Sequence, residues 1–261
     1  MSPELTPAGA DTPSDVLAGE EHESAAAMLP DVNTPGPWAM QLAVRYDKQA
    51  LPCQVAVCEA AAQAVVTLLA DARSRQDGAW APAVRRWRDG RIRKLVRRAR
   101  GQRWDRVQEV PGVTVEHRGA SVRACVPMPA RPLPPLLDAL QVSGTSFPAT
   151  TDTDSIAHRD HSPAVVVIAL TPLAELTTGK AAAQCGHAAQ LVWEHLVRAG
   201  ASATLRAWHD DQWRVEVRDD LTATQWRDLA TAPIQVVDAG YTEVDGPTET
   251  TRAWWTPAVT D

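Results

Sequence analysis

Short apolar runs and one long apolar stripe predict the main elements in the second half of the chain. Residues 164–170 are continuously apolar, as is typical of a strand buried on both faces. Residues 177–179 (Thr-Thr-Gly) then open a helix, and a threonine is a suitable N-cap. The polar residues Lys180, Gln184 and His187 fall on one face of this helix. An apolar stripe marks a different, core-facing side, at Ala182, Cys185, Ala189, Val192 and Leu196.

Shorter patterned segments follow this helix and complete a domain. They comprise a short helix at 205–208, a strand at 213–217, a helix at 222–229 that ends before Pro233, a strand at 234–237 and a strand at 250–255. Strands alternating with helices are typical of α/β domains. We therefore expect a mixed sheet in which most neighbouring strands are parallel.

The first half of the chain repeats this order. An offset of 127 residues sets 40–46 on 167–173 and 56–69 on 183–196, with Cys58 on Cys185. Further along, Trp104 matches Trp226, and 110–119 matches 232–240. One repeat of this length indicates a duplicated domain rather than a solenoid; the alternative is two α/β units whose Ala-rich helices match by coincidence. The prediction is two tandem three-layer α/β/α domains, each with a four-stranded mixed sheet.

Composition and charge set the expected boundaries. Residues 1–36 are rich in Ala, Pro and acids and are expected to be a disordered tail. Residues 145–163 are polar and expected to be a linker, and 131–144 should hold a short helix that packs on the first domain. The net charge of −6 hides a segregation: residues 38–131 carry 18 bases and 8 acids, whereas residues 164–261 carry 7 bases and 13 acids. A basic domain at 37–144 beside an acidic domain at 164–261 suggests a polyanionic partner.

The chain shows no feature of a membrane or secreted protein. No run of 18 apolar residues exists, and the first 30 residues lack the bases and apolar core of a signal peptide. The cysteines form no CxxC pair and are expected to be thiols in a reducing cytoplasm: Cys53, Cys58, Cys125 and Cys185. We therefore expect a cytoplasmic protein.

Three segments of the second domain carry candidate chemistry. Lys180 falls in the first helical turn, where an ammonium and the backbone N–H groups together make an anion site; alternatively it is an ordinary exposed lysine. Asp238 follows an apolar strand, at the edge where open α/β sheets place their sites, or it caps a turn into Gly240. Thr250 lies in a threonine run that by itself indicates only a strand.

Together these segments resemble the peptidyl-tRNA hydrolases of the archaeal/eukaryotic type. The shared motifs are Gly179-Lys180, Ala182-Ala183-Gln184-Cys185-Gly186-His187-Ala188, Asp238-Ala239-Gly240-Tyr241-Thr242-Glu243-Val244 and Thr248-Glu249-Thr250. The resemblance covers about residues 164–257. This chain departs from the family at Lys180, where a Gly-Lys-Gly-Lys start is usual, and at 245–247, where Asp-Gly-Pro replaces the common Pro-Gly.

The resemblance implies hydrolysis of the ester between peptide and tRNA, without a cofactor or metal. The family's catalytic set falls on Lys180, Asp238 and Thr250. Ester hydrolysis requires an activated water and a stabilised oxyanion, roles that would suit Asp238 and Lys180, with Thr250 positioning water or a ribose hydroxyl. Substrate contacts are expected from Gln184, His187 and Thr242, although a helix histidine such as His187 is more often structural. The alternatives are a non-catalytic RNA-binding protein and an esterase acting on another acyl-RNA.

The first domain lacks this catalytic set. Cys53 stands at the place of Lys180, His117 stands at the place of Asp238, and nothing matches the turn at 248–250. The domain instead carries a basic run interleaved with Trp87 and Trp104: Arg85, Arg86, Arg88, Arg91, Arg93, Lys94, Arg97, Arg98, Arg100, Arg103 and Arg106. We expect these bases to form one surface that contacts tRNA phosphates, through Arg93, Arg97 and Arg100; the alternative is a solvated face.

Two further expectations concern metal and assembly. His158, Asp160 and His161 are residue types that bind metals. They fall in the expected linker without a second cluster of candidate ligands, so we expect no metal. Single-domain members of the resembled family are commonly homodimers. A tandem copy satisfies such an interface within one chain, so we expect a monomer with an internal pseudo-dimer.

Overall fold

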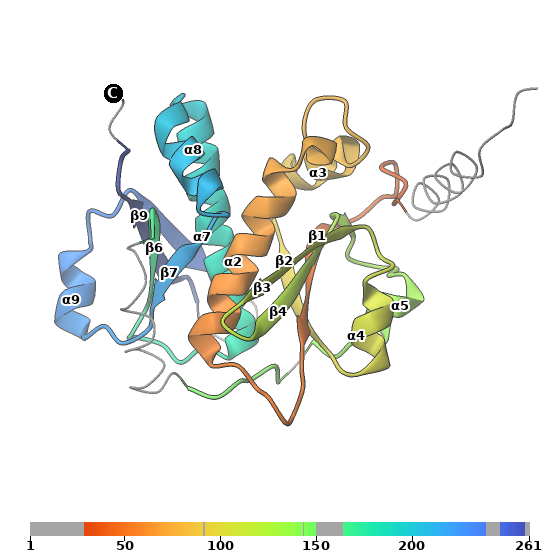
Figure 1. The fold of residues 1–261 in the computed structure, drawn as a ribbon, viewed down its shortest axis with the longest axis horizontal. Coiled ribbons are helices and arrows are strands. Elements are labelled where there is room, and N and C mark those ends of the chain that lie inside the picture. Colours follow the sequence, from red (N-terminus) through yellow and green to blue (C-terminus); the bar gives the residue numbers. More distant parts are fainter. Residues whose placement is uncertain (1–28, 91, 143, 150–163, 239–245, 259–261) are drawn as a thin grey trace, which may run out of the picture.

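The computed structural model describes residues 29–258 except 91, 143, 150–163 and 239–245. It consists of two α/β repeats (Figure 1). The first repeat comprises β1 (Trp38–Arg45), α2 (Gln54–Ala70), the 3-10 turn η1 (Ala72–Ser74), α3 (Ala81–Arg88), β2 (Lys94–Ala99), α4 (Gln102–Val107), β3 (Gly112–His117), β4 (Ala120–Cys125), β5 (Met128–Pro129) and α5 (Pro135–Asp138). The second comprises β6 (Val166–Leu170), α7 (Thr178–Arg198), α8 (Ser202–Asp210), β7 (Val215–Arg218), α9 (Ala223–Asp228), β8 (Ile234–Asp238) and β9 (Thr248–Trp255).

The two repeats share one topology. Their sheets run β2-β1-β4-β3 and β7-β6-β9-β8, with the two outer strands of each order reached through equivalent helices. Trp87 Nε1 donates to the Arg93 carbonyl at 3.0 Å, and Trp208 Nε1 makes the same bond to the Arg214 carbonyl at 2.9 Å. The prediction of two α/β units with mixed sheets is therefore confirmed.

Two details of the sheets differ from expectation. Among the strands that the structure describes, only β1–β2 and β6–β7 pair in parallel. The pairs β3–β4 and β8–β9 are antiparallel, and β4 and β9 also run antiparallel to β1 and β6. The expectation of mostly parallel pairing was thus wrong. The first sheet also has five strands rather than four, since the short strand β5 pairs with the start of β1.

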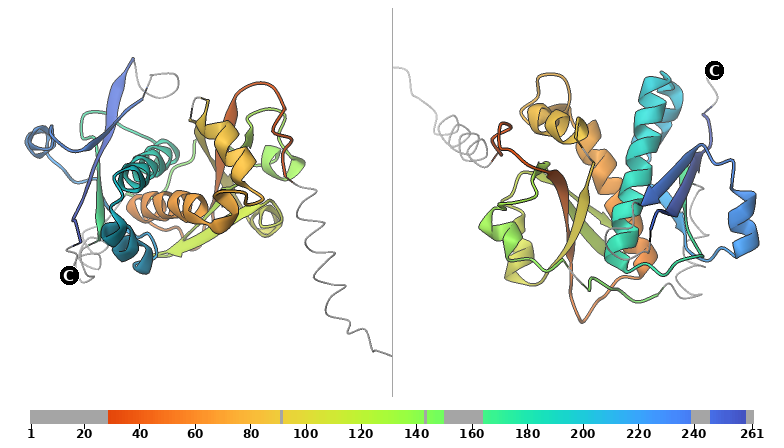
Figure 2. Two further views of the ribbon diagram at one scale, coloured as in Figure 1. Left: turned by 90° about the horizontal axis from the view of Figure 1, so that it is seen from above. Right: turned by 180° about the vertical axis from the view of Figure 1, so that it is seen from behind.

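The two long helices lie side by side between the sheets (Figures 1 and 2). Almost every residue of α2 is buried, which explains why its sequence is apolar on all sides. One hydrophobic cluster runs from β1 and α2 through α7 to β6, so the repeats share a core. The matched cysteines Cys58 and Cys185 are free thiols in this core, and their hydrogen bond, together with burial, raises the pKa of Cys58.

The outer faces of the sheets are covered by short helices. On the first sheet α4 and α5 enclose a second cluster that includes Trp104 and Leu137, which confirms the expected short helix within 131–144. On the second sheet, Arg252 of β9 stacks on Trp226 of α9 at 4.3 Å. Each repeat therefore has helices on both faces of its sheet, as expected for three layers (Figure 2).

Segments outside the two repeats are more ordered than expected where the structure describes them. Leu29 and Val32, in the expected tail, pack against the main core. In the expected linker, Phe147 is buried, and its backbone N–H donates to Thr178 Oγ1 at 3.0 Å. Residues 1–28 and 150–163 lie outside the described part of the chain. Within the described part, every helix is too short or too polar to cross a bilayer.

Candidate active site

The start of α7 places Lys180 beside the end of the second sheet. Thr177 caps the helix by accepting a hydrogen bond from the backbone N–H of Lys180 at 3.3 Å, as the sequence predicted. Gln184 follows one helical turn later and therefore lies on the same face. Both side chains reach Asp238, the last residue of β8.

Asp238 joins these two side chains through one carboxylate oxygen. Its Oδ2 accepts from Lys180 Nζ at 2.6 Å and from Gln184 Nε2 at 2.7 Å. The side chains of Lys180 and Asp238 are only 12% and 14% exposed, so their ion pair is shielded from bulk water. Charge-assisted bonds of this length in a partly buried site are strong, and they hold the carboxylate in one position.

A β-bulge brings Thr250 into the same group. The pairing of β8 with β9 shifts register between Val236 and Val237, which leaves Thr250 opposite the irregularity. Bulges redirect side chains, and here the fully buried Thr250 hydroxyl lies 3.1 Å from Gln184 Oε1 and 3.2 Å from the Val236 carbonyl. Its burial conflicts with the expectation that Thr250 itself positions water or a ribose hydroxyl; its contacts instead orient Gln184.

The four side chains thus form one chain of contacts, Lys180–Asp238–Gln184–Thr250. The Gln184 amide bridges the carboxylate and the buried hydroxyl, a role that the sequence did not suggest. A fixed carboxylate can orient or deprotonate a water, and an ammonium at a helix N-terminus can stabilise a developing oxyanion. This arrangement is chemically suited to hydrolysis of an ester or amide.

His187 lies further along α7, close enough to Asp238 for their charges to interact. Burial, followed by the ammonium of Lys94, lowers the pKa of His187 to about 3, while the carboxylate of Asp238 partly opposes both effects. The imidazole is therefore neutral at physiological pH and a weak base, which favours the structural interpretation. Thr242 lies outside the described residues.

Lys94, from the first repeat, reaches this face of α7. Its Nζ lies 2.5 Å from Gln190 Oε1 and 5.0 Å from the centre of the Trp87 ring. A Cβ at Gly186 would approach the Lys94 side chain to 3.3 Å and Val65 to 3.0 Å, so the glycine makes room for this contact. Burial lowers the pKa of Lys94 to about 7. The sequence placed Lys94 only in a surface run and missed this contact.

The equivalent place in the first repeat holds different chemistry. His117 ends β3 as Asp238 ends β8, and its Nε2 lies 3.0 Å from Glu59 Oε2. Glu59 is buried, and its carboxylate also accepts from Arg118 at 3.1 Å and from the backbone N–H of Val217 at 3.0 Å. This carboxylate ties the two repeats together. An acid within an apolar helix was a sequence signal for such a role.

The basic run does not form one surface. Arg97 is buried, with its guanidinium donating to Gln41 and to the carbonyls of Leu137 and Leu140, so its expected phosphate contact is wrong. Trp87 and Trp104 are buried too and cannot stack on bases. The bases with exposed side chains are Arg85, Arg86, Arg88, Arg93, Arg100, Arg103 and Arg106, whereas Arg91 is not among the described residues.

The expected linker histidines His158 and His161 also fall outside the described part. Among the residues that the structure describes, no three His, Cys, Asp or Glu side chains are grouped as a metal site.

A scan against protein-family models, a search of curated proteins and a search of solved structures each found no match for this chain.

Proposed function

We propose that this protein hydrolyses the ester that joins a peptide to tRNA. The observation that supports the proposal is the contact chain Lys180–Asp238–Gln184–Thr250. The resemblance indicated Lys180, Asp238 and Thr250 from motifs far apart in the sequence. Lys180 contacts Asp238, and Gln184 links Asp238 to Thr250. If the short motifs matched only by chance, their side chains would not be expected to contact one another in this way.

In the proposed reaction, Asp238 accepts a proton from a water as the water oxygen attacks the ester carbonyl carbon. The carbonyl oxygen becomes an oxyanion, which Lys180 and the N–H groups at the start of α7 stabilise. Collapse of the tetrahedral intermediate breaks the bond to the ribose oxygen, which takes the proton from Asp238 and leaves as a hydroxyl. The products are a free carboxylate on the peptide and an intact tRNA. No step requires a cofactor.

Gln184 and Thr250 act in this scheme as positioning residues. Gln184 Nε2 fixes the carboxylate of Asp238, and Thr250 Oγ1 fixes the orientation of the Gln184 amide. A carboxylate that cannot rotate keeps its oxygen aimed at the attacking water, which lowers the entropic part of the barrier.

The first repeat is proposed to attract the tRNA. Exposed arginines lie on α3 and at the entry to β2, including Arg85, Arg86 and Arg93. Arg88 of α3 pairs with Glu194 of α7 at 3.1 Å, so this basic face borders the helix that carries Lys180. Because the second repeat is acidic, a basic neighbour would offset its repulsion of a polyanion.

The proposed setting is a monomer in the cytoplasm. Helices α2 and α7 already bury one another's apolar faces within the chain, as in an internal pseudo-dimer. All four cysteines are free thiols, as is typical of a reducing compartment.

The test is incubation of the full chain with an N-acetylated aminoacyl-tRNA, scored for release of free tRNA. We expect Asp238→Asn to reduce kcat/KM by about 10²-fold or more, because the isosteric amide cannot accept the proton. Failure of the parent protein to release tRNA while binding it would instead favour a non-catalytic RNA-binding protein. Release from other acyl-RNAs but not from this substrate would favour an esterase of different specificity.

A further inference from the structure

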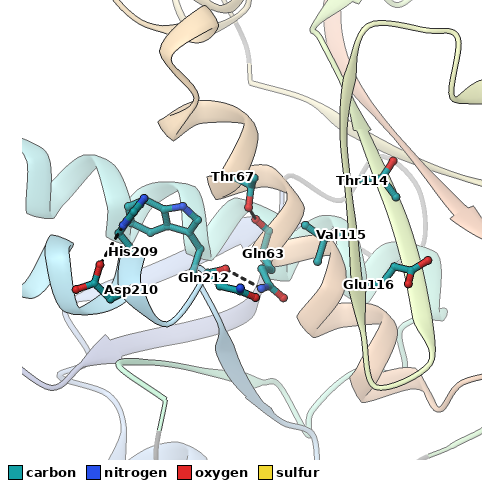
Figure 3. A pocket seen from close by; sticks show the side chains of 9 residues that line it. Gln63, Thr67, Thr114, Val115, Glu116, His209, Asp210 and Gln212 are labelled. Atoms are coloured by element: carbon teal, nitrogen blue, oxygen red, sulfur yellow. Dashed lines mark hydrogen bonds and ion pairs between the residues drawn. The ribbon is translucent and has the colours of Figure 1, made fainter.

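A cavity of about 620 Å³ lies between the repeats (Figure 3). Its described lining does not include Lys180, Asp238 or Thr250. Its walls are α2, β3 and the end of α8 with the turn that follows. Figure 3 shows Gln63 between the α8 side and the β3 side of this space. Specific sites for small molecules commonly have volumes of this order.

The internal repeat shows what occupies the equivalent space on the other side of the helix pair. There Lys94 Nζ donates to Gln190 Oε1 at 2.5 Å. Gln190 Nε2 donates to Glu194 Oε1 at 2.9 Å, and Arg88 pairs with the same carboxylate at 3.1 Å. In this half of the molecule the chain's own ammonium satisfies the glutamine oxygen, and the ion pair between Arg88 and Glu194 lies beside it.

The cavity half keeps the glutamine but lacks the cation. The helix offset that pairs Cys58 with Cys185 also pairs Gln63 with Gln190 and Thr67 with Glu194. The equivalent hydrogen bonds of Trp87 and Trp208 align Arg93 with Arg214. In this alignment the apolar Val215 corresponds to Lys94, and His209 corresponds to Arg88. Neither the ammonium nor the ion pair of the other half can form here.

Gln63 is consequently left with an unused acceptor. The side chain is 7% exposed, and its Nε2 donates to the Gln212 carbonyl at 2.7 Å, which fixes the amide orientation. Its Oε1 is buried and has no hydrogen-bond partner in the described part of the chain. A buried acceptor in this state favours a donor that enters the cavity.

The remaining lining favours a positively charged donor. The exposed acids Glu116 and Asp210 lie on opposite walls, one on β3 and one at the end of α8. Among the described residues, the lining contains no lysine or arginine, and Trp213 adds an aromatic surface that suits an organic cation. Apart from His209, whose Nδ1 lies 3.2 Å from Asp210 Oδ1, these two carboxylates have no basic neighbour among the lining residues, which disfavours a phosphate, so this cavity does not continue the proposed tRNA surface.

We propose that this cavity binds a small linear diamine or polyamine. One primary ammonium donates to Gln63 Oε1, as Lys94 does to Gln190, and a second lies against Glu116 and Asp210. The binding is independent of the proposed ester hydrolysis, so either proposal can fail alone.

The test is calorimetric titration of the full chain with spermidine at constant ionic strength. We expect saturable binding with one site, weakened about tenfold or more by Glu116→Gln with Asp210→Asn, since both removed charges face the ligand. The matched control is Glu175→Gln with Asp228→Asn, which removes the same charge from exposed positions outside the cavity. Absence of saturable binding, or equal weakening in the control, overturns the proposal.

A second variant copies the Arg88–Glu194 ion pair into the half of the molecule that holds the cavity. Thr67→Glu with His209→Arg recreates the Glu194–Arg88 pair at partly exposed positions without changing the formal net charge. We expect it to fold with the thermal stability of the parent and to lose spermidine binding. Choline, which has no N–H donor, should bind at least about tenfold more weakly than spermidine to the parent. A transplant variant that folds and still binds spermidine as tightly as the parent would contradict the proposed site.

Discussion

Replacement of Thr250 by valine tests whether this residue acts through Gln184 or directly on the substrate. Valine has nearly the same shape but removes the hydroxyl that lies 3.1 Å from Gln184 Oε1 and 3.2 Å from the Val236 carbonyl. The hydroxyl carries one proton and donates to one of these two oxygens at a time. Loss of that bond costs about 0.5–1.5 kcal/mol, and a buried acceptor left without a partner costs about 1–3 kcal/mol. We therefore expect a loss of roughly 2–3 kcal/mol in the free energy of unfolding, measured by urea denaturation.

The effect on catalysis should be moderate and confined to kcat. With Thr250→Val, the Gln184 amide can rotate, and Asp238 loses part of its restraint while the Lys180 ion pair remains. We expect kcat to fall about tenfold, corresponding to about 1.4 kcal/mol, with KM nearly unchanged. Thr250→Ser is the matched control, because it keeps the hydroxyl and should recover most of the activity. A loss of about 10³-fold or more in a folded Thr250→Val protein would indicate direct catalysis, and full activity in it would refute the positioning role.

The remaining predictions concern the arginines of the first repeat, the pH dependence of stability, metal and assembly. The double variant Arg93→Glu with Arg100→Glu should raise KM, with a larger effect at low salt, and leave kcat unchanged. Arg97→Glu should instead unfold the protein, because Arg97 is buried, and circular dichroism would show this. Burial lowers the pKa of His187 from 6.5 to about 3, so between these pH values the unfolded chain binds one proton more than the folded chain. The free energy of unfolding should therefore fall as the pH drops through this window. His187→Gln should make this fall less steep. EDTA should leave hydrolysis unchanged, and a loss of activity would revive a metal site. Light scattering should show a monomer at low micromolar concentration, and a stable dimer would contradict the internal pseudo-dimer.

The sequence predicted the elements well where periodicity and capping agreed. The apolar stripe and Thr177 located α7, and the internal match located α2 before any contact was known. Strand direction was harder, because an apolar run does not reveal whether its neighbours are parallel. The short connection between β3 and β4 permits only an antiparallel pair, and that cue went unused.

The candidate site was predictable as a set of residues but not as a network. The motifs predicted Lys180, Asp238 and Thr250 as site residues. They gave no reason to expect that Gln184 bridges Asp238 and Thr250. That role depends on a β-bulge, which is a property of strand pairing. Arg97 shows the opposite failure: a run of arginines predicts exposure, but protein covers both faces of the sheet at β2, so the neighbouring residues Val96 and Arg97 are both buried.

The most direct test of the account follows the oxygen atom in the products. N-acetylated aminoacyl-tRNA should be cleaved in water enriched in heavy oxygen, and both products analysed by mass spectrometry. If water attacks the ester carbonyl beside Asp238, the label appears in the released carboxylate, and the tRNA keeps an unlabelled 3′ end that can be aminoacylated again. Lys180→Ala and Asp238→Ala should each slow the release about 10²-fold or more. Label in the tRNA, cleavage of its backbone, or full activity in both variants would contradict the proposed function.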